Sequence, residues 1–205
     1  MPRVIPSLAL LVASMVGTSA AVAQHPQGSA VPFPVARDTT GMFRSAHAAV
    51  GDDLLIAGQP TAAALRKLKE AGFTTVINLR SPSEMANRQS VPFDEEALVH
   101  ELGMRYVYLP MRGDPDYPYA PDAVAALAKA LRDAKGEKVL LHCTIAWRAS
   151  HLWAAYLFKE QGMSMDEALR HARAINLDAR VPVDGRLPLE HFLDRDVPEL
   201  RRAGH

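Results

Sequence analysis

Short apolar segments alternate with amphipathic ones along most of this chain, and no other feature of the sequence limits its fold as much. Four runs rich in aliphatic and β-branched residues have the length of buried strands. They span residues 53–57, 73–79, 106–109 and 138–141. The segments between and after them carry apolar residues three or four positions apart, which is typical of helices. This order predicts an α/β sandwich with a central, largely parallel sheet flanked by helices.

The expected helices begin at residues suited to that position. Thr61 can cap the first of them, and Ser164 followed by Glu167 forms a capping-box pattern that opens the last. Pro121 stands in the first turn of the most regular helix, where its missing amide proton is not needed. Besides the segment after Ser164, helices are expected over residues 61–71, 93–102, 121–135 and 148–161.

The first 23 residues have the features of a secretory signal peptide. Arg3 supplies a positive start, residues 4–17 are mostly apolar, and Ala21-Val22-Ala23 fits a small-x-small cleavage site. An uncleaved membrane anchor is the alternative, but the proline and polar residues in this stretch make it a poor span. We therefore expect a protein that is periplasmic or secreted and not stably inserted in a membrane. Its parts are a signal peptide (1–23), a linker (24–44) and one domain (45–205).

The charge balance and the cysteine count exclude several classes of function. The chain has 23 basic and 23 acidic side chains, so its bulk charge attracts neither nucleic acid nor an anionic membrane. The single cysteine, Cys143, permits no intrachain disulfide and no cysteine-based zinc site. The histidines show no metal-ligand spacing, and no glycine-rich nucleotide loop is present. We therefore expect no metal, no cofactor and no nucleic-acid partner.

Cys143 stands where a buried strand meets a helix. The strand over residues 138–141 leads into it, a short loop follows, and Arg148 begins the next helix. Loop amides and a helix N-terminus then point inward around the sulfur, which favours a bound anion and a thiolate. Arg148 adds a planar fork for two oxygens of a phosphate or sulfate. A nucleophile facing an oxyanion clamp suits covalent phosphoryl transfer, and the alternative is an inert core cysteine beside a helix-starting arginine.

Several stretches match one protein family in the family's own order. They are residues 55–60 (LIAGQP), 76–80 (VINLR), 108–110 (YLP) and 139–148 (VLLHCTIAWR). With them the chain resembles the cysteine-based protein phosphatases of dual-specificity type, and more closely the bacterial β-lactamase-hydrolase-like phosphatase-like domains. The resemblance covers residues 45–175 and implies the phosphatase α/β sandwich, with Cys143 as nucleophile and Arg148 as phosphate clamp. It also implies a cradle of backbone amides, those of Thr144, Ile145, Ala146, Trp147 and Arg148.

Three features depart from the usual phosphatase loop. Four residues separate Cys143 from Arg148 where five are usual. Four is the spacing in the phosphatase-like bacterial branch, and also in many single-domain rhodaneses, which are sulfurtransferases. Ala146 replaces a glycine, which destabilises the loop by about 1 kcal/mol if its φ is positive. Ala149 follows the arginine where a serine or threonine usually assists breakdown of the phosphoenzyme, and Ser150 comes one place later.

The resemblance also implies a proton donor, usually an aspartate on the loop before the helix that precedes the cysteine strand. Here this loop spans residues 111–118, with Asp114 as the first candidate and Asp116 as the second. Ordinary turn chemistry explains both aspartates equally well. His142 and Ser150 are candidates for tuning the thiolate, although His142 could simply pack beneath the loop.

The other charged and aromatic candidates have simpler interpretations. Trp147 is expected to line the rim of the pocket or to pack under the helix. Arg80 ends a strand, where an ordinary surface or ion-pair role is expected. Glu95 and Glu96 are expected on the solvated face of a helix.

Three functions fit these observations. The first is an exported cysteine-dependent phosphatase-like hydrolase that acts on phosphate monoesters of proteins or small molecules through a cysteinyl-phosphate intermediate. The second is a rhodanese-like sulfurtransferase or persulfide-handling protein that uses the same cysteine. The third is a catalytically degenerate anion-binding module, which the two alanines of the loop region, Ala146 and Ala149, suggest. Covalent phosphate trapped on Cys143 would separate the first function from the other two.

Overall fold

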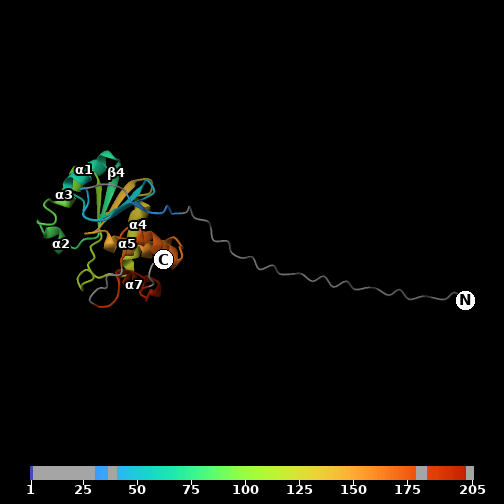
Figure 1. Ribbon diagram of the computed structural model, residues 1–205. Coiled ribbons are helices and arrows are strands. Elements are labelled where there is room, and N and C mark those ends of the chain that lie inside the picture. Colours follow the sequence, from blue (N-terminus) through green and yellow to red (C-terminus); the bar gives the residue numbers. More distant parts are fainter. Residues whose placement is uncertain (2–30, 37–40, 179–183, 202–205) are drawn as a thin grey trace. The chain divides into compact units, whose positions relative to one another are not determined.

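Six strands form one mixed sheet in the part of the chain that the computed structural model describes, which is Met1 and residues 31–36, 41–178 and 184–201 (Figure 1). They are β1 (Val35–Ala36), β2 (His47–Val50), β3 (Leu54–Ala57), β4 (Phe73–Asn78), β5 (Arg105–Tyr108) and β6 (Lys138–His142). Their order across the sheet is β1-β2-β3-β6-β4-β5. The four strands from β3 to β5 in this order run parallel, and β1 and β2 are antiparallel additions at one edge. The predicted largely parallel sheet is therefore confirmed.

Helices pack on both sides of this sheet. Within the described residues they are α1 (Ala62–Glu70), α2 (Pro82–Ala86), α3 (Glu95–Glu101), α4 (Asp122–Asp133), α5 (Trp147–Glu160), α6 (Met165–Arg173), α7 (Pro188–Leu193) and a 3-10 helix, η1 (Pro198–Arg201). The two predicted N-caps are confirmed, because the Thr61 and Ser164 hydroxyls each accept a hydrogen bond from the amide three residues further on. The predicted α/β sandwich is thus the observed fold.

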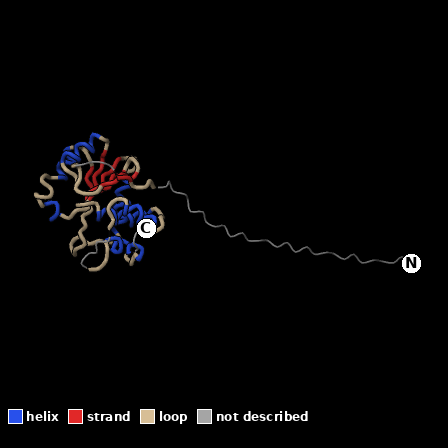
Figure 2. Tube along the Cα trace, in the orientation of Figure 1, coloured by secondary structure: helices blue, strands red, loops and turns tan. Residues whose placement is uncertain are grey.

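The sheet separates two cores, because successive residues of a strand point to opposite faces. In β6, Leu140 packs with apolar residues of α1 and α3, whereas Leu141 belongs to the larger core beneath α4, α5, α6 and α7. Figure 2 shows these helices on the two sides of the strands. Strands covered on both faces need apolar residues at consecutive positions, which explains the uninterrupted apolar runs in the sequence.

The parallel arrangement brings the carboxyl ends of β3, β6 and β4 together. Ala57, His142 and Asn78 lie next to one another across these three strand ends. The segments that leave the strands at this edge begin at Gly58, Cys143 and Leu79, and they contain the matched motifs. Ligands of parallel α/β sheets commonly bind at this edge.

Two segments differ from the sequence-based expectation. The linker expected over residues 24–44 contains β1, which pairs with β2, so the linker prediction is wrong for residues 35–36. A two-residue strand has no measurable periodicity, and Val35 is largely exposed, so neither pattern nor apolar content reveals it. Neither β2 nor α2 was expected, because both are very short.

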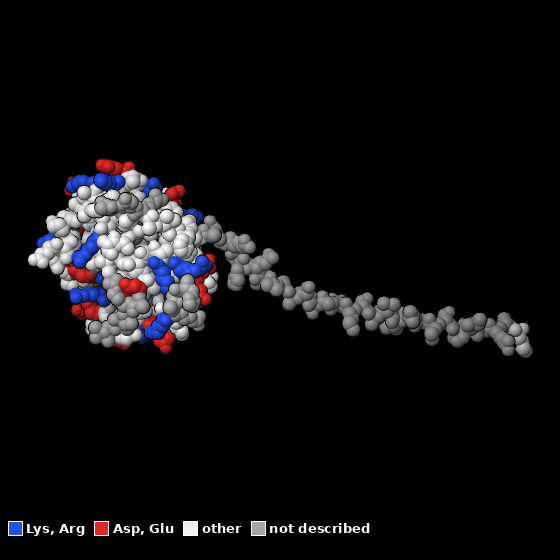
Figure 3. Space-filling model, viewed as in Figure 1, with Lys and Arg blue, Asp and Glu red and all other residues white. Residues whose placement is uncertain are grey.

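Apart from Met1, the predicted signal peptide (1–23) lies within residues 2–30, which are outside the described residues, so the peptide and its cleavage after Ala23 stay predictions. Among the residues that the structure does describe, no helix is both long and apolar enough to cross a membrane. Basic and acidic side chains are interspersed over the face of the molecule seen in Figure 3.

Candidate active site

Cys143 directly follows the last residue of β6 and is almost fully buried. Its amide donates a hydrogen bond to the Ala57 carbonyl of the neighbouring strand, at 3.3 Å. Three loop residues follow, and α5 then begins at Trp147. The structure therefore has the cysteine at a strand end and Arg148 in the first turn of the next helix, as the sequence predicts.

Ala146 closes this loop in a left-handed conformation, with φ of +66°. Its carbonyl accepts hydrogen bonds from the Ser150 amide (2.8 Å) and the Ser150 hydroxyl (2.7 Å), which tie the loop to the first turn of α5. A non-glycine residue in this conformation is strained by about 1 kcal/mol. The strain expected for an alanine at the usual glycine position is therefore present, and the loop still forms.

Arg148 points back from α5 toward the ends of β4 and β6 and is 8% exposed. Its Nη1 donates to the Leu79 carbonyl (2.8 Å) and to Glu84 Oε2 (3.1 Å), and its Nη2 donates to Glu84 Oε1 (3.0 Å). Burial lowers the pKa of Arg148, but the charges of Cys143 and Glu84 outweigh it and the pKa lies above its ordinary value. The guanidinium is therefore held in a fixed orientation, with its charge, beside the sulfur.

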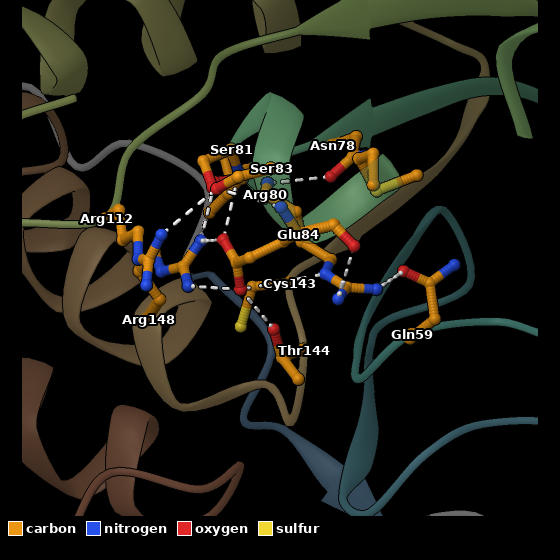
Figure 4. A network of polar contacts seen from close by, with 12 residues as sticks. Gln59, Asn78, Arg80, Ser81, Ser83, Glu84, Arg112, Cys143, Thr144 and Arg148 are labelled. Carbon is orange, nitrogen blue, oxygen red and sulfur yellow. Dashed lines mark hydrogen bonds and ion pairs between the residues drawn. The ribbon is translucent and has the colours of Figure 1, made fainter. Parts of the chain in front are cut away.

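Glu84, on α2, is a site residue that sequence analysis missed. Figure 4 shows its carboxylate between Arg148, Thr144 and Arg80, above Cys143. The Thr144 hydroxyl donates to Oε1 at 2.7 Å, and Arg80 Nε lies 3.7 Å from the same oxygen. Burial raises the pKa of Glu84, but hydrogen bonds and the charge of Arg148 lower it more, to about 2. The carboxylate is therefore ionised at neutral pH.

A sequence signal for Glu84 does exist. Ser81 and Glu84 form a capping box around Pro82, in which the Glu84 amide donates to the Ser81 hydroxyl and the Ser81 amide donates to Glu84 Oε2. This S-P-x-E pattern, directly after a strand, predicts a helix start at the edge of the sheet where the site lies.

Arg80 is buried, so the expected surface role is wrong and the ion-pair role is right. Its side chain is 3% exposed and donates from Nη1 to Gln59 Oε1 (2.5 Å) and from Nη2 to the Glu84 carbonyl (3.3 Å). Burial lowers the pKa of Arg80. The Asn-Leu-Arg and Gly-Gln-Pro motifs thus meet in space, because Gln59 and Arg80 contact each other beside the loop.

Gly58 allows the cysteine loop and the segment at Arg44 to lie close to the end of β3. A Cβ atom at this position would stand 1.7 Å from the Arg44 carbonyl oxygen and 3.0 Å from the Thr144 carbonyl oxygen. The next residue, Gln59, donates its amide to the same Thr144 carbonyl at 3.0 Å. Only glycine fits this close approach, which explains why the Gly-Gln-Pro turn accompanies the cysteine loop.

A second polar cluster lies under the loop, around Glu95. His142 Nε2 is 3.0 Å from Glu95 Oε1, which also accepts a hydrogen bond from Asn78 Nδ2 (3.0 Å), and Gln59 Nε2 donates to Glu95 Oε2. Burial raises the pKa of Glu95, but the charge and hydrogen bond of His142 lower it by more, so this pKa lies below its ordinary value. His142 is therefore held by a buried carboxylate, and its role in tuning the thiolate stays a prediction.

The expected solvated position of Glu95 is wrong, since the residue is 2% exposed. The helical spacing contains the signal: Leu98 and Val99 follow three and four positions later, and both are buried on α3. Glu95 therefore shares their inward face. Glu96 is exposed, as expected.

The two aspartates proposed as proton donors lie on an irregular loop between β5 and α4. Asp114 Oδ1 accepts a hydrogen bond from the Tyr117 amide (2.8 Å), and its Oδ2 lies 3.7 Å from Arg112 Nε. Asp116 has an exposed side chain beside a cavity of about 280 Å³ that Tyr108 and Tyr117 also line. The turn role considered for Asp114 is thus observed, and its role as an acid stays a prediction.

The other loop residues contact the chain that follows α6. Asn176 Nδ2 donates to the Ile145 carbonyl (2.5 Å), and Trp147 Nε1 donates to the Asp178 carbonyl (3.5 Å). Trp147 also packs edge-to-face against the buried His151 ring. These contacts hold the outer side of the loop in place.

Tyr119 is a second residue that the sequence analysis did not single out. Its ring packs edge-to-face on Phe192, at a centroid distance of 5.5 Å, and a Cβ on Gly113 would collide with the ring at 2.5 Å. Burial raises the pKa of Tyr119, and the charges of Arg148 and Cys143 act on it in opposite directions. The phenol therefore lies within electrostatic reach of the site and stays protonated at neutral pH.

Metal ligation has no candidate in this region. Across the described residues, no group of three or more histidine, cysteine, aspartate or glutamate side chains is arranged to hold a metal ion. What the geometry offers is a buried sulfur and two buried arginines, which suit an oxyanion. The cradle of loop amides stays a prediction.

Comparison with known proteins supports this interpretation. Residues 46–157 match the family model of the β-lactamase hydrolase-like protein, phosphatase-like domain. Two β-lactamase hydrolase-like proteins, from two strains of Xylella fastidiosa, are 28% identical to the chain over 134 residues. The aligned region is 64% of this chain and 30% of each relative, so the chain corresponds to less than a third of those proteins.

Solved structures agree with the family match. A DUF442 phosphatase candidate from Shewanella putrefaciens CN-32 is 32% identical, with a TM-score of 0.50 over 62% of this chain and 77% of its own. TpbA from P. aeruginosa is 19% identical, with a TM-score of 0.55 over 79% of this chain and 96% of its own. The latter shows a shared tyrosine-phosphatase-like fold. Since the family model covers more than half of the sequence, the chain belongs to the β-lactamase hydrolase-like protein, phosphatase-like domain family.

Proposed function

We propose that the chain is a cysteine-dependent phosphatase that hydrolyses phosphate monoesters through a cysteinyl-phosphate intermediate. One observation carries the proposal: Cys143, at the end of β6, shares a buried site with the fixed, charged guanidinium of Arg148. A nucleophile and an oxyanion clamp in one loop are the two groups that phosphoryl transfer needs.

In the first step, the Cys143 thiolate attacks phosphorus and an S–P bond forms. The P–O bond to the leaving group breaks, and the leaving oxygen takes a proton from an acid. Arg148 and the amides of Thr144, Ile145, Ala146 and Trp147 hold the phosphoryl oxygens during the transfer. In the second step, water attacks phosphorus, the S–P bond breaks, and inorganic phosphate and the thiolate are released.

We propose that one of two carboxylates, Asp114 or Asp116, donates the proton. Asp114 is engaged by the Tyr117 amide and by Arg112, whereas Asp116 is exposed. General acid catalysis contributes about 10²–10⁴-fold when the leaving group is a poor one. The donor's replacement by asparagine should therefore slow hydrolysis of an alkyl phosphate far more than that of an activated aryl phosphate. An equal effect on both substrates would exclude that residue as the acid.

The substrate class is proposed as phosphorylated protein or a phosphorylated small molecule. A cysteine-to-serine form of TpbA, which shares the fold at 18% identity, has been solved in complex with pTyr. An aryl phosphate is therefore a reasonable first substrate.

Acid trapping tests the mechanism directly. The protein is mixed with an aryl phosphate in reducing buffer, quenched in acid, and examined by intact mass for one covalent phosphoryl group. We expect the adduct in the wild type and neither adduct nor turnover in Cys143→Ser. Turnover that persists in Cys143→Ser would exclude the mechanism.

Sulfur transfer is the second candidate, because the loop has only four residues between Cys143 and Arg148 and a persulfide fits a small loop. This reaction needs no general acid, which agrees with the hydrogen bond that Asp114 accepts from the Tyr117 amide within its own turn. Thiosulfate treatment should then add one sulfur to Cys143, as the S–S bond of thiosulfate breaks and sulfite is released. An anion-binding module without turnover would bind phosphate through Arg148 and give neither adduct.

A further inference from the structure

The Glu84 carboxylate has every acceptor position filled. Its Oε1 accepts from Arg148 Nη2 (3.0 Å) and from the Thr144 hydroxyl (2.7 Å). Its Oε2 accepts from the Ser81 amide (2.9 Å) and from Arg148 Nη1 (3.1 Å). An ionised carboxylate has about four lone-pair positions, so four donors satisfy it. The group is part of the framework that surrounds Cys143.

The same contacts leave one edge of the Arg148 guanidinium unused by Glu84 and by the Leu79 carbonyl. The group carries five N–H bonds, and three of them are directed at Glu84 and at the Leu79 carbonyl. The two that Glu84 and Leu79 do not use are the Nε–H and the second Nη2–H, which lie side by side on the planar group. The Tyr119 hydroxyl lies within hydrogen-bonding reach of the guanidinium, so a bound phosphate would replace it there. Nε is buried and has no hydrogen-bond partner among the described residues. A pair of parallel donors of this kind fits two oxygens of a phosphate.

We propose that Glu84 is a positioning residue. It holds the Nη1 and Nη2 groups of Arg148, so that the edge of the guanidinium that carries Nε faces the phosphoryl oxygens of the substrate. The proposal deepens the phosphatase function above and rests on it for the identity of the anion. It assigns no chemistry to Glu84 itself, which acts through the orientation of Arg148 and of Thr144.

The opposite interpretation is that Glu84 is an internal anion that occupies the phosphate position and must leave. Four contacts oppose this, and one of them is to the Ser81 amide of its own helix cap. Departure would leave the buried donors of Arg148 and Ser81 without partners. Arg80 also lies 3.7 Å from the carboxylate and would keep it in place. The pKa of about 2 means that protonation does not release Glu84 at neutral pH.

Replacing Glu84 with glutamine tests the proposal. The amide keeps the shape but turns an NH₂ group toward donors, so Arg148 loses its fixed orientation. We expect Glu84→Gln to weaken binding of inorganic phosphate, measured by calorimetry, by about 10–100-fold. We also expect kcat for an aryl phosphate to fall, and not only KM to rise. Glu96→Gln, the same change at an exposed position of α3, should alter neither quantity. Unchanged or tighter phosphate binding in Glu84→Gln would overturn the proposal and favour the internal anion.

A measurement on the wild type decides the question if Glu84→Gln does not fold. The Nε–H resonance of Arg148, assigned by its loss in Arg148→Lys, should shift on titration with inorganic phosphate. A titration that shifts other resonances of the loop but leaves this one in place would contradict the proposal. Phosphate binding that depends on Glu84 without any turnover would refute the phosphatase function and leave the positioning role intact.

Discussion

Two polar clusters flank Cys143, and they differ in the basic side chain that faces each carboxylate. On one side Glu84 pairs with Arg148, and on the other Glu95 pairs with His142. A guanidinium is always charged and can donate to both oxygens of a carboxylate, whereas an imidazole presents a single ring nitrogen to it. The first cluster is therefore a bidentate charge pair, and in the second one ring nitrogen of His142 faces Glu95.

The clusters also differ in exposure. The Glu84 side chain is 18% exposed, whereas those of Glu95 and His142 are completely buried. Gln59 connects the two, since its amide contacts both Arg80 and Glu95. The difference suggests a division of roles: the Glu84 cluster prepares the anion site, and the Glu95 cluster supports the strand ends beneath it. Disrupting the first should impair binding and catalysis more than stability, and disrupting the second should do the reverse.

The largest effect is expected for Arg148→Met in the first cluster. The change removes the oxyanion clamp, so kcat/KM for an aryl phosphate should fall by at least about 100-fold. Steady-state kinetics measure the loss, and calorimetry should show that binding of inorganic phosphate disappears. Arg132→Met, which removes an exposed guanidinium on α4, is the control and should have a much smaller effect. Comparable losses in the two variants would mean that general positive charge, and not the fixed clamp, binds the anion.

The second prediction concerns Glu95→Gln in the buried cluster. The amide cannot accept from all of the donors around it, so the free energy of unfolding should fall by about 2–4 kcal/mol. Urea denaturation measures this change. Without urea, and at a pH and temperature where the variant is folded, its kcat should stay within about threefold of the wild-type value. A threefold ratio corresponds to well under 1 kcal/mol. A large loss of kcat with little loss of stability would reverse the proposed division of roles.

Acid should destabilise the protein before either carboxylate is protonated. Burial lowers the pKa of His151 from 6.5 to about 3, so the folded state keeps this ring neutral while the unfolded chain is protonated below pH 6.5. The free energy of unfolding should therefore fall as the pH drops from 6.5 toward 3. The contribution of Glu84, whose pKa is lowered from 4.5 to about 2, is complete above pH 4.5 and is lost progressively as the pH falls from 4.5 to 2.

The variant His151→Phe separates these contributions. Urea unfolding is compared between about pH 7 and pH 5, a range that spans the ordinary histidine pKa but not that of glutamate. The variant should lose less stability over this range than the wild type does. An equal loss in both proteins would show that another group, and not His151, is responsible.

The smallest effect is expected for Ser150→Ala. The Ser150 hydroxyl donates to the Ala146 carbonyl, so its loss should lower stability by about 1 kcal/mol or less, because the carbonyl keeps its bond from the Ser150 amide. Thermal unfolding measures the change. Single-turnover kinetics supply the second measurement: a slower breakdown of the phosphoenzyme would mean that the hydroxyl turns toward Cys143 during catalysis.

The features that could be predicted from sequence are local ones. The apolar run of β6, the caps Thr61 and Ser164 and the order of Cys143 and Arg148 each depend on residues close together in the chain. Glu84 was missed because its partner Arg148 is 64 positions away. Glu95 was predicted to be exposed because it is charged, although its spacing to Leu98 places both residues on one face of the helix. Its partner His142 is 47 positions away.

By itself, the sequence determined the α/β class, the family resemblance and the position of the cysteine between a strand and a helix, because periodicity and capping act within a few residues. Only the tertiary structure decided which donors of Arg148 are occupied, which of the acidic residues are buried, and why Gly58 must be glycine. These properties depend on the strand order β3-β6-β4, which places three loops from distant parts of the chain in contact. Burial and hydrogen bonding at such a junction are set by those contacts, so no local pattern contains them.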